Sequence, residues 1–365
     1  MSLQDHGQTA VDPPVWEVGI ESEGFGVNYV GQPLHIASYF PALSANKDLK
    51  GWFAKEVGPG TFELVGKHEP NLKDACDNVQ GLYRALMEQG RQDGISFEFI
   101  PVSPFASDDF TPYNQSARFV ALWEACQREV ERLHGANCTD WQLLGRLNFR
   151  AALQFHGSLV HDQAIRVDGI DPKVIFVMNV VNLYAPRLAA IICRRLRLKS
   201  QGHLAIWRAW ADPRRFPQFG NWYRNFEHLK ESFEALPRLI KPVDGSKYGG
   251  FEVDLVDHLR WDQALDHGAG WWPLVRPRPH MGKGTLEFRL LPAVPPDLMH
   301  AALDPVVKFI TLLFRLAPEN PPQTLAQFVD SSTHCAITRE KFFGERLPHD
   351  YYERDWKNDF FGRSF

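Results

Sequence analysis

Hydrophobic and polar side chains alternate along several short segments of the chain, which predicts strands that bury one face. These segments are 18–26, 61–65, 95–101, 147–157 and 285–290, and we also expect a strand with its turn over 28–40. In segment 147–157 one face carries Phe149, Leu153 and Phe155, and the other carries Asn148, Arg150, Gln154 and His156. A strand of this kind separates a core on one side from a site on the other.

Apolar positions three and four residues apart predict helices elsewhere in the chain. Segment 71–89 follows this spacing through Ala75, Val79, Leu82 and Leu86, and Asn71 is placed to cap its first turn. We expect further helices over 118–133, 171–197 and 296–316. Together the elements predict an α+β fold, in which a mostly antiparallel sheet has polar groups on one face and helices on the other.

The composition is that of a folded protein without a general attraction for polyanions. Of the 365 residues 44% are hydrophobic and 23% charged, and the net charge of −4 argues against nucleic acid or an anionic membrane as a partner. Five cysteines without a Cys-x-x-Cys pair favour reduced thiols and a cytoplasmic location. The apolar run 174–193 is interrupted by polar residues and a proline, so we expect a buried helix and no membrane span.

Four glutamates near the N-terminus form two pairs. Glu21 and Glu23 share one face of the first predicted strand, while Glu56 and Glu63 flank a Gly-Pro-Gly turn at 58–60. Neighbouring carboxylates on an apolar strand repel each other unless a cation lies between them, and Mg²⁺ prefers oxygen ligands. The alternative interpretation of Glu21 and Glu23 is the solvated face of an edge strand.

The polar faces of the predicted strands would gather five carboxylates and one imidazole into a single trough. The members are Glu21, Glu23, Glu56, Glu63, Glu287 and His156, with Arg276, Arg289 and Arg208 nearby. ATP chemistry with several Mg²⁺ ions needs such a set, because carboxylates hold the metals and arginines neutralise charge on the transferred phosphoryl group. A histidine at a strand end is more often a satisfied surface group, but the polar neighbours of His156 favour a site.

Two basic segments each have two interpretations. Over 205–229 arginines are interleaved with tryptophans, as in proteins that stack nucleic acid bases, but a substrate-lining loop whose arginines bind carboxylate or phosphate agrees better with the net charge. Lys283 lies between Gly282 and Gly284. It is either part of a flexible phosphate-binding loop or an exposed lysine in a turn.

The order of the motifs resembles the carboxylate–amine ligases of the glutamate–cysteine ligase type, which belong to the glutamine synthetase superfamily. The matching motifs are Gly19-Ile20-Glu21-Ser22-Glu23, Glu56-x₆-Glu63, the strand ending in His156, Arg276-Pro277, and Gly284-Thr285-Leu286-Glu287-Phe288-Arg289. The resemblance covers residues 16–316. It implies a curved sheet with a catalytic face in a domain over 15–316, between a flexible leader (1–14) and a C-terminal tail of unknown role (317–365).

The resemblance also implies roles for individual residues. One metal ion would be held by Glu23, Glu56 and Glu63, and another by Glu21, His156 and Glu287. Arg276 and Arg289 would contact phosphate, Lys283 and Arg208 would help to bind the nucleotide, and Arg289, Arg276 and Glu63 would be the catalytic residues. The cofactors would be ATP and two or three Mg²⁺ ions, with Mn²⁺ as a substitute. Trp271-Trp272 and Trp207-Arg208 match the substrate segments of the family.

The chain departs from the family pattern at its substrate end. Gln154 stands where the family has the first histidine of a His-x-His pair, and Pro273 and Leu291-Pro292 replace residues that include acids. We therefore expect an ATP- and Mg²⁺-dependent ligase that joins a small-molecule carboxylate to an amine through an acyl phosphate, without fixing a γ-glutamyl substrate. The alternatives are a phosphotransferase of the guanidino-kinase type and a non-catalytic nucleotide-binding protein. A homodimer is compatible with each of them.

Overall fold

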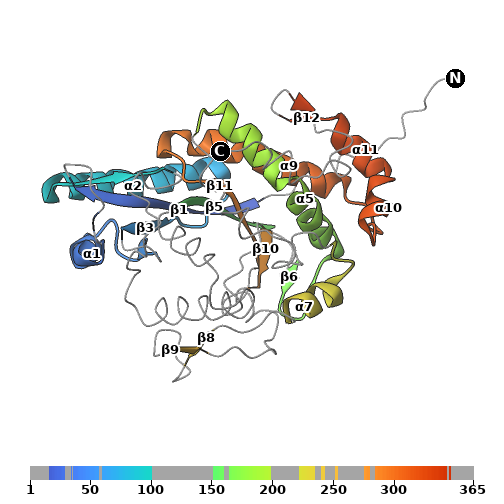
Figure 1. Cartoon of the computed structure of the whole chain (residues 1–365), viewed down its shortest axis with the longest axis horizontal. Coiled ribbons are helices and arrows are strands. Elements are labelled where there is room, and N and C mark those ends of the chain that lie inside the picture. The colour runs from blue at the N-terminus through green and yellow to red at the C-terminus, as the bar shows by residue number, and fades with distance from the viewer. Residues whose placement is uncertain are drawn as a thin grey trace, which may run out of the picture.

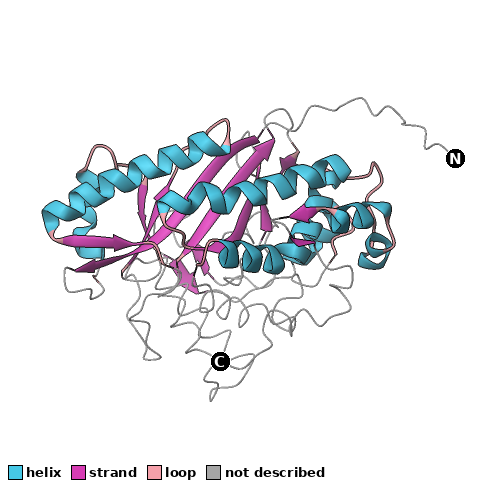
Figure 2. Ribbon diagram, turned by 90° about the horizontal axis from the view of Figure 1, so that it is seen from above, coloured by secondary structure: helices cyan, strands magenta, loops and turns pink. Residues whose placement is uncertain are grey.

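The computed structural model describes residues 16–28, 34, 36–56, 60–100, 151–159, 164–198, 222–234, 240–242, 251–253, 275–279, 284–342 and 345–346. Over these residues the chain forms an open antiparallel sheet with helices packed on it (Figures 1 and 2). The fold therefore mixes helices with an antiparallel sheet, as the residue pattern predicted.

The central sheet has seven strands in the described part of the chain, in the order β10-β11-β5-β1-β3-β2, with β4 paired to the C-terminal end of β1. The strands are β1 (Trp16–Asn28), β2 (Phe53–Lys55), β3 (Thr61–Val65), β4 (Ile95–Glu98), β5 (Ala152–Leu159), β10 (Val275–Arg278) and β11 (Thr285–Pro292). The strands predicted over 18–26, 61–65 and 285–290 are confirmed, and the strand predicted over 95–101 is confirmed as far as Glu98. In segment 147–157 the part from Ala152 is β5, whereas 147–150 lie outside the described residues.

The longer helices are α2 (Leu72–Asp93), α5 (Pro172–Arg195) and α9 (Met299–Leu316), and α2 and α9 lie over one face of the sheet (Figure 1). The core between these layers is formed by the apolar face of the strands. Its strand members include Val18, Ile20, Leu64, Phe155 and Phe288, each no more than 1% exposed. The alternation read from the sequence therefore selects the face that the helices cover.

Helix α2 follows its predicted pattern closely. Asn71 caps it by accepting a hydrogen bond from the Asp74 backbone N–H at 2.9 Å, and the predicted apolar positions are buried. The helix runs four residues past the predicted end, to Asp93, and stops at Gly94, which adopts a left-handed conformation with φ of 70°. A helix of this length brings β4 back to pair with β1.

The strand and turn predicted over 28–40 are wrong over 36–40, because α1 (Ile36–Ala45) is a helix. Ile36 and Leu43, two helical turns apart, are both buried. Ile36 also packs on the bare backbone of Gly26, where an added Cβ would lie 2.5 Å from its Cδ1. Packing of this face against the sheet overrides the strand preference of the β-branched and aromatic residues in the segment. Residues 29–33 and 35 lie outside the described residues.

The predicted loop over 205–229 is wrong at its C-terminal end, where α7 (Phe226–Glu234) begins. Asn225 accepts a hydrogen bond from the His228 backbone N–H at 2.9 Å, as a helix cap does. Leu229 and Phe233, four residues apart, are buried on the same side of the helix. The remaining short pairs are β6 (Ile165–Arg166) with β7 (Gly169–Ile170), and β8 (Ile240–Pro242) with β9 (Phe251–Val253).

Helix α5 is the helix predicted over 171–197, capped by the Asp171 side chain, which accepts a hydrogen bond from the Lys173 backbone N–H. No single helix in the described part of the chain is long and apolar enough to cross a membrane. The two halves of α5, Pro172–Ala185 and Arg187–Arg195, are long and apolar enough for a membrane span only when they are taken together. They are bent by 57° relative to each other.

The predicted closing helix over 296–316 consists of a short 3₁₀ turn η2 (Pro296–Leu298) and α9. Beyond it, the segment described up to residue 346 contains α10 (Leu325–Val329), α11 (Ser332–Arg339), β12 (Lys341–Phe342) and β13 (Glu345–Arg346). Phe328 of α10 is fully buried and stacks on Trp222, with ring centroids 5.0 Å apart. This part of the expected tail is therefore packed on the main core. The helix predicted over 118–133 lies outside the described residues, and the domain boundaries stay predictions.

Candidate metal and phosphate site

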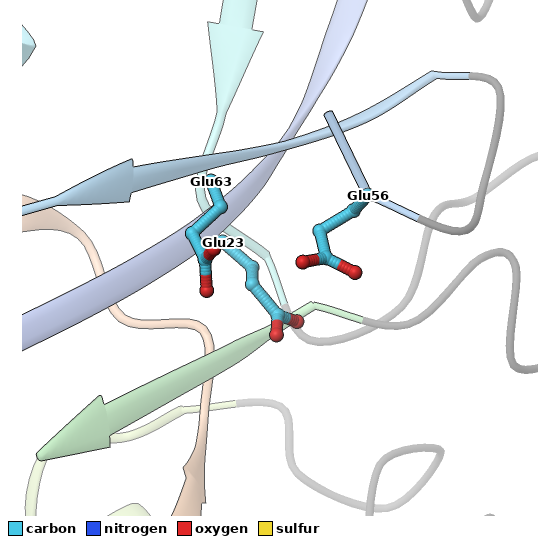
Figure 3. A group of neighbouring side chains, drawn as sticks. All are labelled: Glu23, Glu56 and Glu63. Carbon is cyan, nitrogen blue, oxygen red and sulfur yellow. The ribbon is translucent and has the colours of Figure 1, made fainter. Parts of the chain in front are cut away.

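Three carboxylates converge where β1, β3 and the end of β2 meet (Figure 3). Glu23 on β1 lies directly opposite Glu63 on β3, and Glu56 follows β2, which pairs with the other side of β3. One oxygen of each carboxylate lies within 4.8 Å of one oxygen of the others. We call Glu23, Glu56 and Glu63 the acidic cluster. Its members come from strands that the sequence pattern predicted, held in register by the apolar face.

Strand β5 fixes the orientation of Glu23 through two hydrogen bonds. The backbone N–H of Ala152 donates to Glu23 Oε2 at 2.8 Å, and Gln154 Nε2 donates to Glu23 Oε1 at 2.6 Å. Glu23 is only 6% exposed, so both donors act on a carboxylate that is largely removed from water. Such bonds to an ionised acceptor are stronger than bonds between neutral groups.

Glu63 shows the electrostatic cost of the cluster. Burial raises the pKa of the Glu63 carboxyl well above its ordinary value of 4.5, and the neighbouring carboxylates Glu21, Glu56 and Glu23 raise it further. Without a cation the cluster therefore retains a proton that a single exposed glutamate would lose. A divalent cation would remove the reason for the raised pKa, because it neutralises the mutual repulsion.

Glu21 and His156 lie beside the cluster on the next part of the same face. His156 on β5 is opposite Gly19 of β1, and its Nε2 lies 3.1 Å from Glu21 Oε1. The contact is poorly aligned, so Nε2 makes no hydrogen bond within the described residues. Burial would raise the pKa of Glu21, but the charge and proximity of His156 outweigh it and bring this pKa to about 2. Glu21 is therefore an ionised carboxylate with an imidazole at hand.

Glu287 on β11 lies opposite His156 on one side and Arg276 of β10 on the other. Arg276 donates from Nε to Glu287 Oε2 at 2.6 Å and from Nη2 to Oε1 at 3.1 Å. Arg289 also donates to Oε1, and Arg278 Nε lies 3.7 Å from Oε2. We call Arg276, Arg278 and Arg289 the arginine group. One carboxylate, 1% exposed, thus faces three guanidinium groups.

The pKa values at this end follow from the same contacts. Burial alone would raise the pKa of Glu287, but Arg276 and Arg289 outweigh it and hold the pKa well below its ordinary value. Burial also lowers the pKa of Arg276 to about 10, in spite of Glu287. Burial works against the charge of Arg289 as well, but Glu287 and the carboxylates Glu21, Glu23 and Glu63 raise its pKa. Arg289 therefore interacts with both the acidic and the basic parts of the site.

The structure brings eight of the ten predicted site residues together on or directly beside neighbouring strands of one sheet. They are Glu21, Glu23, Glu56, Glu63, His156, Arg276, Glu287 and Arg289. Lys283 and Arg208 lie outside the described residues, as do Trp207, Trp271 and Trp272. The roles assigned to all of these residues stay predictions.

Two residues at the site were not predicted as members of it. Arg278 shares a face with Arg276 on β10, and the sequence Arg276-Pro277-Arg278 carries that signal as an alternation of period two. Gln154 was placed on the polar face of its predicted strand and noted as a departure from the family pattern, but it was given no role at the site. Both contact carboxylates of the site.

The donor set fits a hard divalent cation at the acidic cluster. Three carboxylates from three chain segments approach one point, and a raised pKa at Glu63 marks the unbalanced negative charge. The fit of the second predicted set, Glu21, His156 and Glu287, is less complete. In this structure the Glu287 carboxylate is bonded to Arg276 and Arg289.

The described fold is similar to that of a solved glutamate–cysteine ligase, in agreement with the motif resemblance. The glutamate–cysteine ligase of Francisella tularensis, solved in complex with AMP, superposes with a TM-score of 0.50 at 12% identity, over 85% of this chain and 68% of that one. A bifunctional glutathione synthetase from Pasteurella multocida gives 0.43 at 11% identity, over 90% of this chain and 43% of that one. The structure of GmaS without ligand gives a TM-score of 0.39 at 13% identity, over 94% of this chain and 64% of that one. No protein-family model and no curated protein sequence matches the chain.

Proposed function

We propose that the chain is an ATP- and Mg²⁺-dependent ligase that forms an amide bond between a carboxylate and an amine. The observation that carries the proposal is the acidic cluster, which lies on the same sheet as the arginine group, with Glu21 and His156 between them. The proposal is supported by the fold shared with a glutamate–cysteine ligase that was solved with AMP. Low identity leaves the acid and the amine open, including whether the acid is a γ-glutamyl donor.

We assign catalysis to the sheet face that α2 and α9 leave uncovered. Glu21 and Glu23 on β1, Gln154 and His156 on β5, and Glu287 and Arg289 on β11 alternate with buried apolar residues and so share this face. The registers place acidic groups at the β3 side and arginines at the β10 side. A triphosphate bound along this direction would meet cation ligands at one end and guanidinium groups at the other.

Glu23, Glu56 and Glu63 would hold one Mg²⁺ ion, and Glu21, His156 and Glu287 would hold a second once Glu287 releases part of its arginine contacts. When bound, these ions neutralise phosphate oxygens and make the γ-phosphorus more electrophilic. The protein groups orient the reactants. Arg276 and Arg289 would contact the transferred phosphoryl group and balance the charge that develops on it, with Lys283 and Arg208 as further nucleotide contacts.

The reaction would proceed in two displacements. An oxygen of the substrate carboxylate attacks the γ-phosphorus of ATP, the bond to the β-phosphate oxygen breaks, and ADP leaves an acyl phosphate. The amine nitrogen then attacks the acyl carbon, phosphate departs with the bonding electrons, and the nitrogen loses a proton to give the amide. Because neither step requires a covalent bond to the protein, positioning and charge neutralisation account for catalysis.

The proposal is tested with the purified chain, ATP, Mg²⁺ and pools of amino acids, small acids and amines. We expect ADP release only when an acid and an amine are both present, and a product whose mass equals their sum minus one water. Glu63→Gln should lower the rate by about a thousandfold or more, as expected for a group at the reacting phosphates. Glu17→Gln, a glutamate on the neighbouring strand β1 and outside the site, is the matched control.

Other products would assign a different function. A stable phosphorylated acceptor without an amide would indicate a phosphotransferase. Nucleotide binding without ADP release under any pool would indicate a non-catalytic protein. The small-molecule substrates, the cytoplasmic location and a homodimer remain parts of the proposal that this experiment leaves to separate measurements.

A further inference from the structure

Gln154 lies between the two acidic parts of the site. It is directly opposite Glu21 in the pairing of β5 with β1, and it precedes His156 by two residues on the same face. Its side chain also reaches Glu23, the register neighbour of Glu63 in the acidic cluster. Gln154 is 1% exposed, so a neutral amide is enclosed among carboxylates and shielded from water.

The two ends of this amide are in different situations. Nε2 donates to Glu23 Oε1 at 2.6 Å, and this contact fixes the orientation of the amide, because a carboxylate oxygen accepts hydrogen bonds and repels another oxygen. Oε1 has no hydrogen-bond partner within the described residues. A buried carbonyl oxygen without a partner is unfavourable, and native proteins seldom retain one without a ligand, an ion or a water.

The surroundings of Oε1 favour a cation as its partner. Glu21 and Glu23 are acceptors when ionised and cannot donate to an amide oxygen. The Nε2 atom of His156 lies 3.1 Å from Glu21 Oε1 and makes no hydrogen bond to Gln154 within the described residues. A divalent cation beside Glu21 and Glu23 would satisfy both carboxylates and the amide oxygen at once. Side-chain amide oxygens are ordinary ligands of hard cations.

We infer that Gln154 Oε1 is an additional, neutral oxygen ligand of a divalent cation bound beside Glu21 and Glu23. The inference rests on the proposed function for the presence of the cation. An amide oxygen in place of an imidazole nitrogen replaces a borderline ligand with a hard one. The site should therefore prefer Mg²⁺ over Co²⁺ more strongly than it would with a histidine at this position.

The test is isothermal titration of Mg²⁺, and separately of Co²⁺, into the full chain and three variants. Gln154→Leu should weaken Mg²⁺ binding by about tenfold or more. Gln154→His should shift the ratio of the two dissociation constants by about tenfold toward Co²⁺, because the imidazole coordinates Co²⁺ more tightly. Ser158→Ala, on the same strand and face but opposite Glu17, should leave both affinities unchanged.

Each other outcome overturns the inference in a distinguishable way. If Gln154→Leu loses affinity while Gln154→His keeps the wild-type metal preference, Gln154 acts only by orienting Glu23 and does not touch the cation. If neither substitution changes binding, the oxygen has no cation partner, although the proposed function stands. If the wild-type chain binds neither metal, the proposed function fails together with the inference. Circular dichroism of each variant verifies that the fold is retained.

Discussion

At the scale of single residues, the site is defined by charges that are unfavourable without a ligand. Glu63 is half-buried among carboxylates that raise its pKa, whereas Glu287 is held ionised by Arg276 and Arg289. Both are glutamates on polar strand faces, and their opposite behaviour follows from their partners. In a bound metal–triphosphate complex, the metal ion would neutralise the acidic cluster and the phosphate oxygens would contact the arginine group.

The raised pKa of Glu63 predicts how Mg²⁺ stabilisation depends on pH. Above the ordinary value of 4.5 the folded chain binds a proton that the unfolded chain has lost, so the free energy of unfolding decreases as pH rises toward the folded-state pKa. Mg²⁺ bound at the acidic cluster would replace this proton. We therefore expect the rise in Tm caused by Mg²⁺ to be larger at pH 8 than at pH 6, by differential scanning fluorimetry.

Glu63→Gln is the control for this prediction, because it removes the titrating group and a cation ligand together. The Mg²⁺-dependent rise in Tm should then be small at both pH values. A rise of equal size in wild type at pH 6 and pH 8 would contradict the assignment of a retained proton to the acidic cluster.

At the scale of secondary structure elements, α2 contains two glycines in opposite environments. An added Cβ at Gly81 would meet no atom within 4 Å, whereas at Gly90 it would lie 2.6 Å from the backbone oxygen of Ile95 and from the Phe97 ring. Gly90 allows the end of α2 to approach β4 closely. Gly81 has no such role, and the helix tolerates it at an entropic cost.

We therefore expect Gly81→Ala to increase the free energy of unfolding by about 0.5–1 kcal/mol. Gly90→Ala should decrease it by about 1–3 kcal/mol, because the new methyl group forces β4 away from the helix. Chemical denaturation of the two variants beside wild type measures both effects. Destabilisation by Gly81→Ala, or a neutral Gly90→Ala, would show that the packing of α2 on β4 is misplaced.

At the scale of the whole molecule, the fold could be predicted where a local pattern coincides with tertiary burial. Apolar and polar residues alternate along the strands that carry Glu21, Glu63 and Glu287. The sequence therefore predicted both the strands and the sheet face on which each carboxylate lies. Helix α2 was predictable because its cap and apolar spacing agree. Segment 36–45 was not predictable, since the contact of Ile36 with Gly26 decides its conformation.

The part of the site that the sequence did not reveal depends on strand register. Strand β10 contains Pro277 and is followed by Pro279, a composition that argues against a strand. Pro277 is tolerated because β10 lies at the edge of the sheet among the described strands. The pairing of Arg276 with Glu287 and the approach of Arg278 exist only through this edge position. Likewise the bond from Gln154 to Glu23 joins residues 131 positions apart, and no local pattern encodes it.

The part of the C-terminal segment that packs on the main core predicts a stability effect far from the site. Phe328 is fully buried between Trp222, Phe176 and His334. Phe328→Ala should decrease the free energy of unfolding by about 3–5 kcal/mol, because it removes a core aromatic side chain. Asp330→Ala, exposed in the same helix end, should change it by less than about 0.5 kcal/mol. Urea denaturation measures both effects. An unchanged free energy of unfolding in Phe328→Ala would show that the C-terminal segment does not contribute to stability.

The central claim is that Glu23, Glu56 and Glu63 form the cage of a divalent cation, and titration calorimetry with Mn²⁺ tests it most directly. The account predicts saturable binding to wild type, a loss of affinity of about a hundredfold or more in Glu63→Gln, and unchanged binding in Glu17→Gln. Equal binding by all three proteins, or no binding by the wild type, would contradict it.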